Sequence, residues 1–88
     1  KVIPFNANWN NANSVTWLNK LTDCKTSQID IATDKTAQSK YKIVVVPTII
    51  VFNQGEEVKR YQANIMMQIE AKLEDIQHIV DETVMESF

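Results

Sequence analysis

The 88-residue sequence predicts an α/β fold, with a central four-stranded mixed sheet and flanking helices. Two runs rich in β-branched residues lie on either side of a polar turn at residues 53–55, a pattern typical of a β-hairpin. Ile29 and Ile31 alternate with polar neighbours, as in a half-buried strand. Near the C-terminus, apolar residues recur every three or four positions, the period of an amphipathic helix. They are Ile69, Leu73, Ile76, Val80 and Val84.

The N-terminal part predicts a strand, a loop and a short helix. Residues 1–6 contain an apolar run, and Pro4 within it indicates a bulge or an edge, because proline cannot donate to a strand ladder. Residues 6–13 include five asparagines, which favour turns and helix caps, so we expect a loop there. A helix should follow over residues 14–22, with Asn13 as its cap and three apolar side chains on one face. These are Trp17, Leu18 and Leu21.

The remaining elements follow from local patterns. Residues 25–32 predict the second strand, and the polar residues 34–40 predict a short connecting helix. After the hairpin, Asn64 should cap the longest helix, from residue 65 to about residue 85. The resulting order is β-α-β-(α)-β-β-α. A strand–helix–strand unit crosses over right-handedly, so the first two strands should be parallel, whereas the hairpin strands should be antiparallel.

Length and composition exclude several classes of protein. The chain is short enough to form one domain over residues 1–88. A net charge of −2 provides no basic surface for nucleic acid or for a membrane. No apolar run approaches the roughly 20 residues that span a bilayer, and no signal-peptide pattern is visible, so we expect a cytoplasmic protein. One cysteine and one glycine exclude an internal disulfide, a cysteine-rich metal site and a glycine-rich phosphate loop, so no cofactor is expected.

The stretch from Lys40 to Tyr61 carries a specific motif. It follows the pattern K-Y-x-I-x-x-(I/V)-P-T-x-x-x-F-x-x-G-x-x-V-x-R-(F/Y), which resembles the C-terminal half of thioredoxins. The resemblance implies a minimal thioredoxin fold, in which Pro47 is the cis-proline that faces the active site of the family. The matching positions are Lys40, Tyr41, Ile43, Val46, Pro47, Thr48, Phe52, Gly55, Val58, Arg60 and Tyr61.

The N-terminal half departs from the family at its reactive residues. Phe5, Ala7 and Trp9 are similar to the F-x-A-x-W that precedes the C-x-x-C motif of thioredoxins. By this resemblance the two cysteine positions fall on Asn10 and Asn13. Thiol–disulfide exchange requires a nucleophilic thiolate and a second thiol that resolves the mixed disulfide. An amide side chain provides neither group.

Two supporting groups of the family are also replaced. Thioredoxins bury an aspartate just before the phenylalanine position, and Pro4 stands there in this chain. A lysine on the adjoining strand accompanies that aspartate, and an ungapped alignment places Gln28 at its position. The sequence therefore predicts that the protein is not a catalytic oxidoreductase.

The replaced residues do not exclude a binding function, because peptide binding in the family does not depend on the thiols alone. Thioredoxins hold an extended peptide against the cis-proline loop through the backbone of the preceding residue, which is Val46 here. The resemblance implies a peptide-binding groove formed by Trp9, Asn10, Asn13, Val46 and Pro47. We therefore expect a redox-inactive protein-binding, adaptor or structural module with a protein or peptide partner. Alternatively, Trp9 and Pro47 only pack the fold.

The main alternative is a thiol-dependent redox protein that uses the lone Cys24 or the thiol of a partner. A free cysteine is commonly a small buried hydrophobic residue, and in this fold Cys24 would lie at the end opposite Pro47. The exposure and the pKa of its thiol discriminate between these readings. A purely structural building block instead predicts that a partner or a second copy covers Trp9 and Pro47. Met66 and Met67 are expected to fill the core or the groove.

Overall fold

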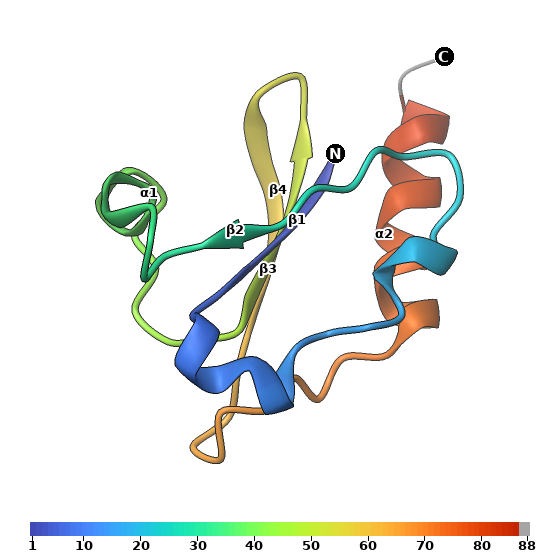
Figure 1. Ribbon diagram of the computed structural model, residues 1–88. Helices are drawn as coiled ribbons and strands as arrows, with labels where there is room; N and C mark the ends of the chain where they lie inside the picture. Colours follow the sequence, from blue (N-terminus) through green and yellow to red (C-terminus); the bar gives the residue numbers. More distant parts are fainter. Residues whose placement is uncertain (87–88) are drawn as a thin grey trace.

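The computed structural model describes residues 1–86, and it has the predicted α/β architecture (Figure 1). One four-stranded sheet has the strand order β2-β1-β3-β4. The longest helix, α2, lies along one side of the sheet, whereas the short helix α1 lies on the other side. The elements are β1 (Val2–Asn6), the 3-10 helices η1 (Asn8–Asn13) and η2 (Leu18–Lys20), β2 (Ile29–Asp30), α1 (Lys35–Lys40), β3 (Thr48–Asn53), β4 (Glu56–Gln62) and α2 (Leu73–Glu86).

The strand directions are those expected from the sequence. β1 and β2 are parallel, and β3 is antiparallel to both β1 and β4. Gln54 and Gly55 form the two-residue hairpin turn with φ angles of 54° and 83°. Both angles are positive, as a type I′ turn requires, and glycine adopts such a conformation without steric penalty. A shift of register at Val51 and Phe52 makes Val58 a bulge in β4.

Alternation along the strands divides the apolar residues between two layers. Ile49 and Val51 of β3 join a cluster with Ile76 and Val80 of α2 on one face of the sheet. Ile50 lies on the other face, because successive side chains of a strand point to opposite sides. The cluster on that face comprises Ile3, Phe5, Ala7, Ile43, Val46 and Ile50. The interior therefore consists of two thin layers that share one sheet.

Pro4 lies in a central strand, β1, but the pairing of β1 with the second-strand segment is interrupted at Pro4, as a bulge or an edge on that side implies. The N–H and the carbonyl of Val2 both bond across to the second-strand segment, at Lys25 and Ser27. Backbone groups two residues apart point the same way along a strand, so the backbone nitrogen of Pro4 also points toward the second-strand segment. Proline carries no N–H there to donate. The pairing accordingly splits into an isolated bridge between Val2 and Thr26 and the short strand β2. The second strand is thus only two residues long, not the eight residues expected over 25–32.

The helix expected over residues 14–22 does not form. The structure has η1 before this segment and η2 within it. Asn13 does not cap a helix, because its side-chain amide donates instead to Asn10. Ser14 is already extended, with ψ of 142°, and the β-branched residues that follow it are weak helix formers. Local side-chain bonds therefore replace the helix that the pattern predicted.

The last helix begins at Leu73, not at residue 65. Asn64 does act as a cap, but for an isolated turn in which its Oδ1 accepts the N–H groups of Met66 and Gln68. Met67 then has a φ of 59°, which interrupts any helix. Asp75 starts α2 by accepting the N–H of Lys72 at 2.8 Å, as an acidic residue does in a capping box. From Leu73 onward, α2 has the predicted apolar face, with Ile76, Val80 and Val84 in the core cluster or packed against it.

Within residues 1–86, α2 is the longest helix, with 14 residues. No helix in this part of the chain is both long and apolar enough to cross a membrane. The same residues contain no group of three or more His, Cys, Asp or Glu side chains that could hold a metal ion.

Candidate functional site

The residues predicted for the site meet at one end of the sheet, where η1 approaches the start of β3 (Figure 1). The side-chain Nδ2 of Asn10 lies 3.5 Å from the carbonyl oxygen of Val46, to which it donates. The Val46–Pro47 peptide bond is cis, and the carbonyl of Pro47 accepts the N–H of Ala63 at 3.0 Å. Asn10 is only 6% exposed, whereas Trp9 beside it is 64% exposed.

Most of the asparagines of residues 6–14, a segment that we call the asparagine loop, form one hydrogen-bond network with Ser14. Asn13 donates to Oδ1 of Asn10 at 2.9 Å, and Asn10 donates to Oδ1 of Asn6 at 3.3 Å. Asn6 in turn donates to the carbonyl of Asn10 and to Oγ of Ser14. The Ser14 hydroxyl donates to Oδ1 of Asn11 at 3.0 Å. Amides and a hydroxyl thus bond to one another at the positions where the sequence resemblance places the reactive pair of the family.

Asn6, Asn11 and Ser14 were not among the predicted site residues. The density of asparagine in this segment was visible in the sequence, but it indicated only a loop. Which amide would bond to which depended on the approach of Val46, 36 residues away from Asn10.

The segment before Pro47, which we call the Pro47 loop (residues 43–47), differs in character. Val44 is 76% exposed and Val45 is also exposed, whereas Val46 and Pro47 are buried. The carbonyl of Val45 is held by the hydroxyl of Thr48 at 2.7 Å. Among residues 1–86, the N–H groups of residues 44–46 have no hydrogen-bond acceptor. Three N–H groups of the Pro47 loop are therefore left without a partner, next to the exposed side chains of Val44 and Val45.

Arg60 of β4 holds the segment that precedes this loop in place. Its guanidinium donates to the carbonyls of Tyr41 and Lys42 at 2.7 and 2.9 Å. It also makes a two-point ion pair with Glu57, at 3.0 and 2.8 Å. The hydrogen bond from Arg60 lowers the pKa of the Glu57 carboxyl, and the same bond raises the pKa of Arg60. The motif included Arg60, but only the structure gives its role.

Further exposed apolar side chains lie at the same end of the molecule. The segment that follows β4 starts beside Pro47 at Ala63, and Figure 1 shows it looping below the sheet near η1. Met66 and Met67 in this segment are exposed, so they do not fill the core, and the alternative that they line the groove stays a prediction. The exposed apolar residues of these three segments are Trp9, Val44, Val45, Ile65, Met66 and Met67.

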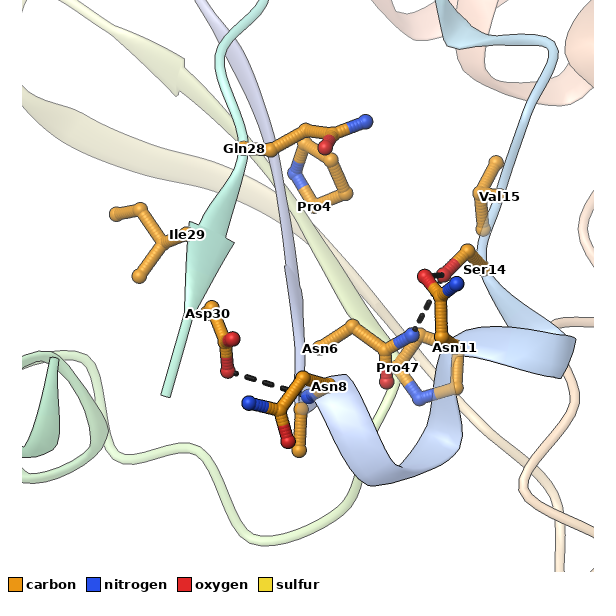
Figure 2. A pocket seen from close by; sticks show the side chains of 11 residues that line it. Pro4, Asn6, Asn8, Asn11, Ser14, Val15, Gln28, Ile29, Asp30 and Pro47 are labelled. Atoms are coloured by element: carbon orange, nitrogen blue, oxygen red, sulfur yellow. Dashed lines mark hydrogen bonds between the residues drawn. The ribbon is translucent and has the colours of Figure 1, made fainter. Parts of the chain in front are cut away.

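A pocket of about 290 Å³ opens next to Pro47 (Figure 2). Its walls come from β1, β2 and the asparagine loop, and they include Gln28, for which the family resemblance implies the position of a lysine. Asp30, at the end of β2, is held by two backbone donors, because its Oδ1 accepts the N–H groups of Asn8 at 3.3 Å and of Ala32 at 2.9 Å. Asp30 and this pocket were not predicted from the sequence.

Cys24 lies away from all of these residues. It is half-buried, and it borders a small hollow with Lys1, Val51 and Val80. Burial raises the pKa of the Cys24 thiol, against the opposing effect of the N-terminal ammonium group. A raised pKa reduces the thiolate fraction, which is the nucleophilic form.

Two comparisons with known proteins agree with the fold. The family model described as Thioredoxin matches residues 4–75. The solved structure of thioredoxin 1 from the thermophilic eubacterium Thermosipho africanus TCF52B is similar, with a TM-score of 0.70 and 17% sequence identity. That match covers 98% of this chain and 96% of the other chain, and at such low identity it concerns the fold alone. No curated protein sequence matches. The family model covers most of the chain, so this protein belongs to the thioredoxin family.

Proposed function

We propose that this thioredoxin-family domain does not exchange disulfides and that it acts by binding an extended segment of a partner protein across the Pro47 loop. The observation that carries the proposal is the contrast between two neighbouring segments. Asn10 and Asn13 stand at the family's cysteine positions and bond to each other. The adjacent Pro47 loop has free N–H groups and exposed valines in the described part of the chain.

The chemistry of the site supports the loss of exchange activity. An amide cannot act as a nucleophile toward a disulfide or resolve a mixed disulfide. The one thiol, Cys24, borders a different hollow and has a raised pKa. Pro4 and Gln28 stand where the family resemblance places proton-transfer groups, and neither side chain titrates. No residue at this end of the sheet therefore supplies the redox step.

The surface supports binding of an extended peptide. A bound strand can accept hydrogen bonds from exposed backbone donors, which provides affinity without any requirement for sequence. Val44 within the loop and Trp9, the neighbour in sequence of Asn10, offer large exposed apolar area. Exposed tryptophan side chains often dominate the energy of an interface, because they bury a large area with few rotatable bonds. Such a domain serves as an adaptor or as a subunit of a larger assembly.

The test has a binding arm and a redox arm. In the binding arm, Trp9 fluorescence is followed in a Trp17→Phe background, with a pool of capped, tryptophan-free random heptapeptides as the probe. In the redox arm, reduction of insulin by dithiothreitol is measured with the wild type and with an Asn10→Cys/Asn13→Cys double variant. We expect saturable binding, no acceleration by the wild type and measurable acceleration by the double variant. Wild-type catalysis at the rate of the double variant, or a Trp9 that does not respond, would overturn the proposal.

A further inference from the structure

The pocket beside Pro47 has one charged wall. Figure 2 shows Ile29 and Asp30 on one side of the pocket and Asn11, Ser14 and Val15 on the opposite side. Asp30 is the only ionisable residue among those that line it, and no Lys, Arg or His is present there to neutralise the carboxylate. The electrostatic character of the pocket is therefore acidic.

The Asp30 carboxylate is held in place, but only one of its two oxygens accepts hydrogen bonds. Its Oδ1 accepts two backbone N–H groups, from Asn8 and Ala32, which fix the position of the side chain. Within the described part of the chain its Oδ2 has no hydrogen-bond partner. The side-chain amides of Asn8 and Gln28 are likewise without partners among residues 1–86. Three side chains at the pocket therefore retain unused hydrogen-bond acceptors.

Size and apolar lining narrow the class of ligand. A volume of about 290 Å³ is at the lower limit of small-molecule sites, which range from about 300 to 1,000 Å³. It suits one long side chain better than a cofactor. Pro4, Val15 and Pro47 supply apolar surface along which an aliphatic stem can lie while its charged head reaches a polar group. An arginine guanidinium carries five donors and pairs with carboxylates at two points.

We propose that this pocket receives an arginine side chain of the bound partner segment, with Asp30 as its counter-charge. The inference rests on the proposed function, because Pro47 belongs both to the binding loop and to the pocket wall. A peptide that crosses the Pro47 loop would thereby acquire a preference for one basic residue. The backbone donors would hold any extended chain, whereas Asp30 would select among chains.

The test uses two capped pentapeptides, Ac-Ala-Ala-Arg-Ala-Ala-NH2 and the same peptide with citrulline, the neutral isostere of arginine. Two-dimensional ¹H–¹⁵N NMR follows the amides of Asn8 and Ala32, which report on Asp30, and the amide of Val46, which reports on the groove. We expect the arginine peptide to bind roughly 5- to 30-fold more tightly than the citrulline peptide.

Two variants separate charge from structure. Asp30→Asn keeps an oxygen that can accept the two backbone bonds but removes the charge, so it should abolish the preference for arginine. Asp23→Asn removes the same charge at a site outside the pocket, and asparagine tolerates the positive φ of 62° found there. It should preserve the preference.

The outcomes distinguish the two proposals. Equal affinities for both peptides, with shifts at Val46, would overturn the arginine pocket and leave the groove standing. Arginine-dependent shifts at Asn8 and Ala32 without any at Val46 would support the pocket and contradict the groove. An absence of shifts at all three amides at millimolar peptide would contradict both.

Discussion

The asparagine loop and the Pro47 loop lie side by side and differ in how their polar groups are used. In the asparagine loop the side-chain amides of Asn6, Asn10 and Asn13 bond to one another or to nearby backbone. In the Pro47 loop the backbone N–H groups of residues 44–46 have no acceptor in the described chain. The amides of Asn6, Asn10 and Asn13 are thus bonded internally, whereas three N–H groups of the Pro47 loop are left without a partner in the described chain. The proposed function assigns the binding to the second segment and requires no chemistry of the first.

The largest expected effect comes from the centre of this hydrogen-bond network. Replacing buried Asn10 by leucine leaves Oδ1 of Asn6, the amide of Asn13 and the carbonyl of Val46 without their partner. Because unsatisfied buried polar groups are destabilising, we expect a loss of about 2 kcal/mol in the free energy of unfolding. Urea denaturation followed by circular dichroism measures it. Asn8→Ala, at an exposed position, is the control and should change stability by less than about 0.5 kcal/mol. Equal losses in both variants would mean that the network is not structural.

A somewhat smaller effect is expected where β4 supports the segment before the Pro47 loop. Arg60→Met removes the bonds to the carbonyls of Tyr41 and Lys42, which precede the Pro47 loop. We expect a loss of about 1 kcal/mol, since these bonds are charge-assisted but partly exposed to solvent. Binding of the heptapeptide pool should weaken as well, because the loop is less well positioned. Lys59→Met, in the same strand, should leave both properties close to those of the wild type.

Trp9 should contribute to peptide binding and not to the free energy of unfolding. The side chain is 64% exposed, so Trp9→Ala should change the free energy of unfolding by less than about 0.5 kcal/mol. Peptide affinity should fall by about tenfold, as is typical for removal of an aromatic anchor. Isothermal titration calorimetry and urea denaturation of the same sample separate the two quantities. A variant that unfolds easily but binds normally would assign Trp9 to packing.

The smallest expected effect is the pH dependence from Glu57. The hydrogen bond from Arg60 lowers the pKa of Glu57 in the folded state, so its stabilisation is present above the pKa of the unfolded state, about 4.5. It is lost as the pH falls through the lowered value. Because the pair is exposed, the change should be slight. A comparison of urea midpoints at pH 6 and pH 3.5 should show a smaller decrease for Glu57→Gln than for the wild type. An equal decrease would mean that the pair contributes nothing.

The parts of the fold that sequence patterns predicted are those with local determinants. The hairpin was predictable because a β-branched run, a glycine turn and a second strand stand next to one another in the chain. The final helix was predictable from Leu73 onward, where its apolar period meets the sheet. The positions of Asn10 and Pro47 at one end of the sheet followed from the family resemblance.

Some predictions from the sequence were wrong because polar side chains bond to one of several groups that the folded chain brings close. Asn13 bonds to Asn10 and so does not cap a helix, and Asn64 closes a single turn well before α2. The pocket beside Pro47 depends on segments that only the folded chain brings together, with Asp30 as its charged wall. No local pattern encodes these choices, because each amide has several equivalent partners within reach.

The most direct test of the central contrast is one NMR titration of the ¹⁵N-labelled protein with the heptapeptide pool, in which both loops are observed together. The account predicts that the backbone amides of residues 44–46 shift in a saturable manner. It also predicts that the side-chain amide resonances of Asn10 and Asn13 stay dispersed and in place, since their network is internal. Large shifts or broadening of those side-chain amides, with residues 44–46 unaffected, would contradict the account and assign binding to the asparagine loop.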